Sequence, residues 1–420
     1  MPRQPFGTLQ AVTDVLPPHL REAHRRLAFG AAQILPEDGL ANRLLVADRE
    51  GRPLRVKLGI DPSGAELTLG HAVVLRKLRQ FQDFGHLAVL IVGGFTGQVG
   101  DPSGRTNTRA ALSAAQTAAN ARTYFEQLMR ILDPTRVEIR DNTEWLSSMT
   151  LADVMAYGRE LTVARLLERD DFARRFREGR PITLTEFCYP LLQGIDSVAV
   201  HADIELGGTD QTFNNLVGRE LQRSAGQAPQ AVLTVPLLVG TDGVEKMGKS
   251  LNNYVAIAEP PEEQFGKLMS IPDTLIGDYA RLCTDLQPEE VAEVEEAAAG
   301  GGPTANAAKR RVAATIVALY HGDDAAAKAE KHFDTLFREG GVPADVPVHP
   351  LPPGDPLHLP ALLVDLGFAP STSAARRLVD EGAVRIDGER LNAREYDLLR
   401  ARLAGHVLAA GKRRLARLEG

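Results

Sequence analysis

Two short segments carry residue types that could bind and activate a phosphate group. The first runs from Gly59 to His71 and reads Gly-Ile-Asp-Pro-Ser-Gly-Ala-Glu-Leu-Thr-Leu-Gly-His. An apolar run ends at its Asp-Pro pair, and the pattern predicts that a helix begins at Gly70-His71. A helix N-terminus presents unpaired N–H groups and a partial positive charge, which suit phosphate. Taken alone, the segment is also compatible with a strand-to-helix turn that a histidine caps.

The second segment is Lys246-Met-Gly-Lys-Ser250, which follows an apolar run at 231–239 and a turn at Thr241-Asp-Gly243. Two ammonium groups three residues apart could neutralise the charge that develops on transferring phosphate oxygens. Lysine is a flexible point charge, suited to following a leaving pyrophosphate. On its own the segment could also be a solvated surface loop.

The elements around these segments predict an α/β fold. Short apolar runs at 54–60 and 87–94 are typical of buried parallel strands, and residues 71–84 between them place apolar side chains on one helical face. Further strands are expected at 137–140 and 231–239, and helices at 151–169 and 210–223. We therefore predict a Rossmann-like, doubly wound parallel sheet over residues 1–255. In such a sheet ligands bind at the carboxyl ends of the strands, where both segments begin.

The rest of the chain predicts smaller parts. Alanine- and glutamate-rich runs at 289–299 and 307–320 indicate an α-helical domain over 256–340. Six prolines between 343 and 356 indicate a semi-rigid linker at 341–356, and 357–420 has the apolar periodicity of a small independent domain. From Asp355 onward there are eleven Lys/Arg and nine Asp/Glu, a net charge of +2, although the whole chain carries −7. This asymmetry suggests an appended module that binds an anion.

Composition excludes several classes of protein. Hydrophobic residues make up 44% and charged residues 25% of the chain, which is typical of a globular protein. The acidic net charge excludes whole-chain basicity as the means of binding nucleic acid. Cys188 and Cys283 cannot form a disulfide framework, and no apolar run approaches the roughly 20 residues that span a bilayer. Because the first ten residues also lack the apolar core of a secretion signal, we expect a cytoplasmic protein without membrane contact.

Together the two segments resemble the paired motifs of class I aminoacyl-tRNA synthetases, which stand here as Thr68-Leu-Gly-His71 and Lys246-Met-Gly-Lys-Ser250. Three segments between them, Gly93–Arg105, Tyr189–Asp196 and Gly207–Gln211, narrow the resemblance to the bacterial tyrosyl-tRNA synthetase family. Residues 361–391 resemble the S-four-type RNA-binding domain. The resemblance implies a Rossmann-like catalytic domain, then an α-helical anticodon-side domain, then a small α+β RNA-binding domain.

The resemblance also implies roles for individual residues. Tyr189, Gln193 and Asp196 are spaced i, i+4 and i+7 and so share one helical face. The family uses the aspartate at this place to accept the phenolic proton of tyrosine. The implied tyrosine-binding residues are Asp101, Tyr189, Gln193, Asp196 and Gln211. The implied catalytic residues are Thr68, His71, Lys246 and Lys249. The implied ATP-binding residues are Gly59, Asp61, Ser63, Gly70, His71, Gly208, Asp210, Lys246, Lys249 and Ser250. The candidate tRNA contacts are Arg376, Arg377, Arg385, Lys412, Arg413 and Arg414.

The implied reaction joins L-tyrosine to ATP, releases pyrophosphate, and passes the tyrosyl group to the terminal ribose of tRNA(Tyr). Mg²⁺ is expected to arrive with ATP, and no protein-bound metal is expected because no Cys/His cluster has zinc-ligand spacing. A homodimer is expected from the resemblance, and DNA is not expected as a partner. Three positions depart from the family pattern: Thr68 replaces a histidine, Gly248 replaces a serine, and Lys57 stands where many members carry a tyrosine. We expect the loss of that tyrosine to leave more of the phenol recognition to Asp196.

Three other functions remain open from the sequence. A tryptophanyl-tRNA synthetase would share the fold and both phosphate motifs, although the Tyr189–Asp196 face favours tyrosine. An RNA-binding protein that has lost catalysis would not need the intact lysine and histidine positions. A small-molecule nucleotidyltransferase would not explain the C-terminal module.

Overall fold

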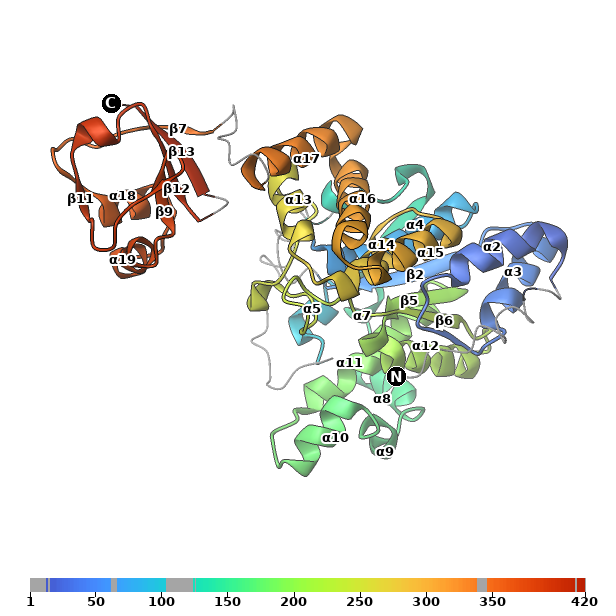
Figure 1. Ribbon diagram of the computed structural model, residues 1–420. Helices are drawn as coiled ribbons and strands as arrows, with labels where there is room; N and C mark the ends of the chain where they lie inside the picture. Colours follow the sequence, from blue (N-terminus) through green and yellow to red (C-terminus); the bar gives the residue numbers. More distant parts are fainter. Residues whose placement is uncertain are drawn as a thin grey trace. The chain divides into compact units, whose positions relative to one another are not determined.

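A computed structural model describes residues 13, 16–61, 66–102, 124, 126–337, 346–411 and 414–419. The chain divides into two compact units (Figure 1). The first unit comprises Met1–Pro260 and Lys267–Tyr320, and the second comprises Pro261–Gly266 and His321–Gly420. No helix among the described residues is long and apolar enough to cross a membrane.

A six-stranded sheet forms the centre of the first unit, with the strand order β1-β6-β5-β2-β3-β4. The strands are β1 (Gln33–Leu35), β2 (Arg55–Ile60), β3 (Leu87–Val92), β4 (Val137–Asp141), β5 (Ile204–Gly208) and β6 (Ala231–Val235). All neighbours are parallel except β1, which runs antiparallel to β6 at the edge. Because β3 and β6 are almost wholly apolar, they can be covered on both faces, as parallel strands require.

The order of the strands creates the place for a site. From β2 the chain adds β3 and β4 on one side, and then returns to add β5 and β6 on the other. The connections therefore leave β2 and β5 in opposite directions, which opens a crevice at the carboxyl ends of these neighbouring strands. The predicted doubly wound parallel sheet is confirmed, whereas the short antiparallel strand β1 was not predicted.

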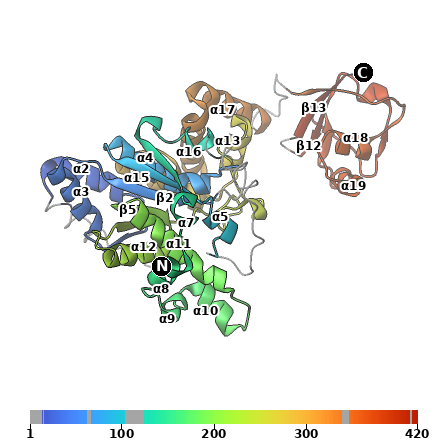
Figure 2. The same cartoon turned by 180° about the vertical axis from the view of Figure 1, so that it is seen from behind.

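Helices cover both faces of this sheet (Figure 2). On one face lie α4 (Leu69–Asp83), α14 (Ile276–Cys283) and α15 (Pro288–Ala299), and on the other lie α11 (Leu184–Ala199) and α12 (Thr212–Ser224). Among the described residues this unit also contains α2 (Pro18–Ala28), α3 (Gly39–Glu50), α5 (Thr96–Val99), α7 (Thr143–Leu146), α8 (Leu151–Gly158), α9 (Val163–Leu166), α10 (Asp170–Arg177) and α16 (Gly302–His321, whose last residue belongs to the second unit). Short 3₁₀ turns occur at η1 (Pro134–Arg136), η2 (Thr209–Gln211), η3 (Lys249–Leu251) and η4 (Asp273–Leu275).

One predicted helix is wrong in extent. The run 151–169 forms two helices, α8 and α9, separated by residues 159–162. The side chain of Thr162 accepts a hydrogen bond from the backbone N–H of Arg165 and so starts a new helix. A threonine in that role favours a helix start over a helix interior.

The second unit contains a five-stranded sheet with the order β10-β9-β12-β13-β7 and a two-stranded sheet of β11 and β8. Its strands are β7 (Val348–Pro350), β8 (Leu357–His358), β9 (Val384–Ile386), β10 (Glu389–Arg390), β11 (Asp397–Leu398), β12 (Val407–Ala410) and β13 (Arg414–Glu419). Its helices are α17 (Asp323–Phe337), α18 (Leu359–Asp365), α19 (Thr372–Asp380) and the turn η5 (Arg400–Arg402), and α13 (Pro261–Met269) begins in it. A core that includes Leu359, Leu363, Val379, Leu408 and Leu418 holds α18 and α19 against the larger sheet.

The segment 341–356, expected as a linker, is partly structured. Within it β7 pairs in parallel with β13, and Leu351 is buried. This strand contains Pro350 and lies at the sheet edge, where a residue without an N–H is tolerated.

Candidate functional site

A cavity of about 320 Å³ opens at the carboxyl ends of β2 and β5, at the place that the strand order indicates. It brings together predicted site residues from widely separated parts of the chain. Those that line it are Gly59, Asp61, Gly70, His71, Asp101, Tyr189, Gln193, Asp196, Gly208, Asp210 and Gln211. Ser63 lies outside the described residues.

The start of α4 fixes the ring of His71. The backbone N–H of Thr68 donates to His71 Nδ1 over 3.2 Å, and the Thr68 hydroxyl lies 2.8 Å from the same nitrogen. Because Nδ1 accepts the backbone hydrogen bond, the neutral ring carries its proton on Nε2. Thr68 itself is 1% exposed. The buried hydroxyl of Thr68 therefore orients the ring of His71.

The environment of His71 favours a neutral ring at pH 7. Surrounding protein, and secondarily the positive charge of Lys249, lower its pKa to about 4, although the residue is exposed where it lines the cavity. A neutral ring with a proton on Nε2 is a hydrogen-bond donor. This side chain can therefore donate to an anion without carrying a positive charge.

The two predicted phosphate segments meet in space. The backbone N–H of Leu69 donates to Val255 O over 2.9 Å, and Thr68 forms a β-bridge with Ala256 just after the lysine segment. A Cβ placed on Gly70 would lie 3.6 Å from the Cβ of Met247. The sequence-based expectation that both segments face one ligand is thus consistent with their proximity.

The lysine segment is exposed and held at its base. Gly248 N–H donates to Asn253 Oδ1 over 2.8 Å, and Lys249 Nζ donates to the backbone carbonyl of Glu66 over 2.8 Å. Partial desolvation lowers the pKa of Lys249. The charge of Lys246 acts on Asp210, a cavity residue whose pKa is raised by surrounding protein and by Asp101. Ser250 is exposed within η3 and, like Lys246 and Lys249, does not line the cavity.

Asp61 links the two sides of the cavity. Its carboxylate accepts from the Tyr189 hydroxyl over 2.7 Å and from the Thr96 hydroxyl over 2.9 Å. The carboxylate packs directly against Gly93, where an added Cβ would come within 1.8 Å of Asp61 Oδ1. Any residue larger than glycine at 93 would therefore displace Asp61. Desolvation, together with the negative charges of Asp61 and Asp101, raises the pKa of Tyr189, so this phenol stays protonated.

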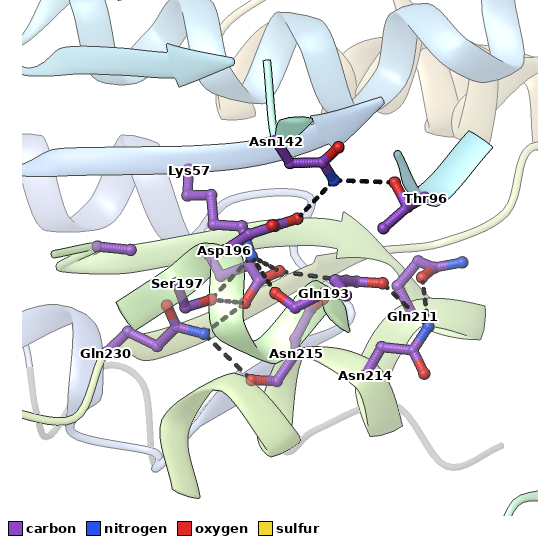
Figure 3. Close-up of polar contacts among 12 residues, drawn as sticks. Lys57, Thr96, Asn142, Gln193, Asp196, Ser197, Gln211, Asn214, Asn215 and Gln230 are labelled. Atoms are coloured by element: carbon purple, nitrogen blue, oxygen red, sulfur yellow. Dashed lines mark hydrogen bonds and ion pairs between the residues drawn. The ribbon is translucent and has the colours of Figure 1, made fainter. Parts of the chain in front are cut away.

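Asp196 lies on α11 and is 3% exposed. Trp145 Nε1 donates to its Oδ1 over 2.9 Å. Asn142 Nδ2 donates to its Oδ2 over 3.3 Å and to Thr96 Oγ1 over 3.0 Å (Figure 3). Burial raises the pKa of Asp196 to about 7, and the positive charge of Lys57 is the largest influence in the opposite direction. Each carboxylate oxygen has a second lone pair, so the group can accept one more proton donor from the cavity.

The other predicted cavity residues are also held by neighbours. Gln193 Nε2 donates to Glu205 Oε1 over 3.2 Å, and Gln193 Oε1 accepts from Asn214 Nδ2 over 3.1 Å. Gln211 Nε2 donates to Asp101 Oδ2 over 2.9 Å. Side chains that are already oriented need little reorganisation when a ligand binds.

Sequence reasoning missed several residues that support the cavity: Thr96, Asn142, Trp145 and Glu205. One signal was available, since Asn142 directly follows β4 and therefore lies at the same sheet edge. Lys57 was noted only as a departure from a family pattern. It is fully buried and does not line the cavity.

The predicted RNA contacts fall in the second unit. Arg376 and Arg377 are exposed on α19, and the guanidinium of Arg376 lies 5.5 Å from the ring centre of Tyr396. Arg385 is partly buried on β9, and the guanidinium of Arg414 donates to the backbone carbonyl of Phe368. Lys412 and Arg413 lie outside the described residues. Within the described part of the chain, no group of three or more His, Cys, Asp or Glu side chains could hold a metal ion.

Comparisons with known proteins agree with this geometry. Residues 49–338 match the family described as tRNA synthetases class I (W and Y), and residues 359–399 match the S4 domain. The chain is 49% identical over 394 residues to the tyrosine–tRNA ligases of Moorella thermoacetica and Thermotoga maritima, which covers 94% of this chain and 95% and 96% of those proteins.

Solved structures show the same fold. A tyrosyl-tRNA synthetase from Archaeoglobus fulgidus, complexed with L-tyrosine, aligns with a TM-score of 0.59 and 21% identity over 74% of this chain and 99% of that chain. A tryptophanyl-tRNA synthetase from Plasmodium falciparum aligns with a TM-score of 0.53 and 14% identity, and the alignment covers 79% of this chain and 89% of that chain. At these identities the likeness concerns the fold alone, and does not distinguish the two amino acids.

Proposed function

Because the chain belongs to the class I tRNA synthetase family of tryptophan and tyrosine enzymes, we propose that it is a tyrosine–tRNA ligase. It activates L-tyrosine with ATP to tyrosyl-adenylate and pyrophosphate, and then transfers the tyrosyl group to the 3′-terminal ribose of tRNA(Tyr). The relatives that are nearly half identical over almost the whole chain carry the tyrosine name, which favours this function over a tryptophan enzyme.

The observation that carries the proposal is the position of Asp196. Its buried carboxylate lines the same cavity as Gly70 and His71, and two neutral donors already orient it. A buried carboxylate that can accept one more donor favours a ligand with a hydroxyl at its far end, because a hydrogen bond to a charged group contributes more than one between neutral groups. Tyrosine meets this condition and phenylalanine does not.

The reaction needs no nucleophile from the protein. A tyrosine carboxylate oxygen attacks the α-phosphorus of ATP, the new C–O–P bond forms, and the bond to pyrophosphate breaks with its electrons on the leaving oxygen. The protein supplies position and charge. His71 Nε2–H and the amide end of α4 donate to phosphate oxygens, and Lys246 and Lys249 follow the leaving pyrophosphate. Mg²⁺ bound to ATP would add further positive charge there.

Other cavity residues position the two substrates. Asp210, beside Gly208, accepts from the ribose hydroxyls of the nucleotide. Tyr189, Gln193, Asp101 and Gln211 surround the amino acid, with acceptor oxygens available for its ammonium group. These roles follow from the residue types that line the cavity and from the family to which the chain belongs.

The second unit binds the tRNA. The match to the S4 domain supports this role, and the exposed arginines of α19 supply phosphate contacts. Lys412 and Arg413 remain candidates on the basis of the sequence. We place the protein in the cytoplasm, where tRNA and ATP are available.

The protein forms a homodimer through the apolar surface of α8–α11. Five large apolar side chains in this region are 60–79% exposed: Leu151, Met155, Val163, Phe176 and Leu184. They come from four consecutive helices, and contiguous exposed apolar surface marks protein interfaces. The variant Leu184→Glu should sediment as a monomer in analytical ultracentrifugation while the unchanged chain sediments as a dimer; a monomeric parent would contradict the proposal.

A pyrophosphate-exchange panel tests the function as a whole. Labelled pyrophosphate should enter ATP in the presence of tyrosine, and not with tryptophan or phenylalanine at the same concentration. Exchange that depends on tryptophan would favour the other enzyme of this family. No exchange with any amino acid would favour an RNA-binding protein that has lost catalysis.

A further inference from the structure

Lys57 is a fully buried ammonium group in the wall behind the cavity. It extends from β2, and its Nζ lies 2.9 Å from Glu205 Oε1, 2.8 Å from Ser197 Oγ and 2.9 Å from the backbone carbonyl of Gln193 (Figure 3). The hydroxyl proton of Ser197 is directed to Glu205 Oε2 over 3.0 Å, so Ser197 must accept from Lys57. Three acceptors around one nitrogen require three N–H groups, and only the protonated amine has them.

Glu205 is the matching carboxylate. Its Oε1 accepts from Lys57 and from Gln193 Nε2, and its Oε2 accepts from Ser197 and from Gln230 Nε2. Four donors satisfy both oxygens of an ionised carboxylate. Lys57 and Glu205 thus form a buried ion pair. Their other hydrogen bonds go to Gln193 and Ser197 on α11 and to Gln230.

The ion pair lies next to two polar side chains that line the cavity, Gln193 and Asp196. Lys57 binds the carbonyl at the start of the turn 193–197, Glu205 binds the Gln193 side chain, and Asp196 lies on the same turn. Two charged groups act on Asp196, Lys57 on β2 and Glu205 on β5. Asp61 and Asp101, together with Asp196 itself, act on Tyr189. Among those acting on Asp196 directly, Lys57 alone supplies a positive charge.

We propose that Lys57 is a positioning residue, which with Glu205 holds the tyrosine-recognition turn of α11 in place and sets tyrosine affinity and its pH dependence without touching the substrate. This inference rests on the proposed function. It assigns to Lys57 a role different from the lost phenol contact that its sequence position suggests, because Lys57 does not line the cavity and its Nζ is bonded to Gln193, Ser197 and Glu205.

Two variants test the proposal. Lys57→Met removes the positive charge but leaves Glu205 unpaired in the interior, which is strongly destabilising. The double variant Lys57→Met/Glu205→Gln removes both charges with side chains of similar length, a change that buried ion pairs often tolerate. Lys77→Met is the control, since Lys77 is also a buried lysine that binds backbone carbonyls, but none of its partners Leu27, Phe29 and Gln80 lines the cavity, whereas Lys57 binds the cavity residue Gln193.

Tyrosine- and ATP-dependence of pyrophosphate exchange should be measured from pH 6 to pH 9, with thermal melting to confirm folding. For the double variant we expect the KM for tyrosine to rise roughly 10-fold at pH 7, with KM for ATP and kcat within about twofold of the parent. Because Lys57 opposes protonation of Asp196 more strongly than Glu205 favours it, the rise in KM toward acid should begin at a higher pH than in the parent. Lys77→Met should follow the parent.

Three outcomes would contradict the positioning role of Lys57. A folded double variant with parental KM for tyrosine and a parental pH profile would overturn the positioning role, and so would equal losses for tyrosine and ATP. A double variant that does not fold would also count against it, because the pair would then serve stability rather than the cavity. If the parent itself shows no tyrosine-dependent exchange, the proposed function fails first, and this inference fails with it.

Discussion

Replacing Asp196 by asparagine should weaken tyrosine binding while leaving the chemical step nearly unchanged. The variant keeps the size of the side chain but removes its charge. Both carboxylate oxygens accept from a donor, Trp145 on one and Asn142 on the other. The new NH₂ group must therefore face one of these two donors. We expect it to face Asn142, because the contact to Asn142 is longer than the contact to Trp145.

The size of the effect follows from the lost hydrogen bond. A hydrogen bond between the phenol of tyrosine and an ionised carboxylate contributes about 1.5–3 kcal/mol. That range corresponds to a rise of about 10- to 150-fold in the KM for tyrosine. Phenylalanine has no hydroxyl to lose, so its weak binding should stay the same or improve, and discrimination between the two should fall by about the same factor.

Pyrophosphate exchange with each amino acid measures both quantities. The control is Asp203→Asn, because Asp203 is another buried aspartate but pairs with Arg52 and does not line the cavity. In the parent, KM for tyrosine should rise as the pH falls through about 7, where Asp196 becomes protonated, and in Asp196→Asn this dependence should disappear. Equal loss for tyrosine and phenylalanine, or an unchanged KM for tyrosine, would refute the assigned role.

Three further predictions concern other parts of the protein. Alanine at Lys246 or Lys249 should slow adenylate formation about 10²- to 10³-fold in single-turnover measurements and leave tyrosine affinity unchanged; a variant that bound tyrosine weakly but kept its rate would show that these charges act in the ground state. A chain that ends at residue 345, before β7, should keep pyrophosphate exchange and lose most tRNA charging; undiminished charging would remove the S4 domain from the tRNA site. The stability of Asp196→Asn relative to the parent should increase from pH 4 to pH 7, as measured by urea unfolding. The folded pKa of about 7 lies above the ordinary value of 3.8, so across this interval the parent's folded state binds more protons than its unfolded state and loses stability as the pH rises; a relative stability that does not change with pH would mean that Asp196 is ionised throughout.

The sequence by itself determined the parts that depend on neighbouring residues. The apolar runs that became β2, β3 and β6 predicted the parallel sheet, and the spacing of Tyr189, Gln193 and Asp196 predicted their common helical face. The order of the two phosphate segments indicated the edge of the sheet where the cavity lies. These features follow from local periodicity and from the carboxyl-edge rule for parallel sheets, so no tertiary contact was needed to infer them.

Only the tertiary structure decided which distant side chains became partners. Trp145 and Asn142 meet Asp196 across more than fifty residues, and Lys57 meets Glu205 across 148. Lys57 and Glu205 are Cα partners in the β2–β5 ladder, and that register cannot be read from either strand alone. The same holds for Thr68, which the resemblance placed among the catalytic residues and whose buried hydroxyl lies 2.8 Å from His71 Nδ1. The sequence gives the chemical type of each side chain. Its partner depends on strand register and helix packing, which result from the packing of the whole core.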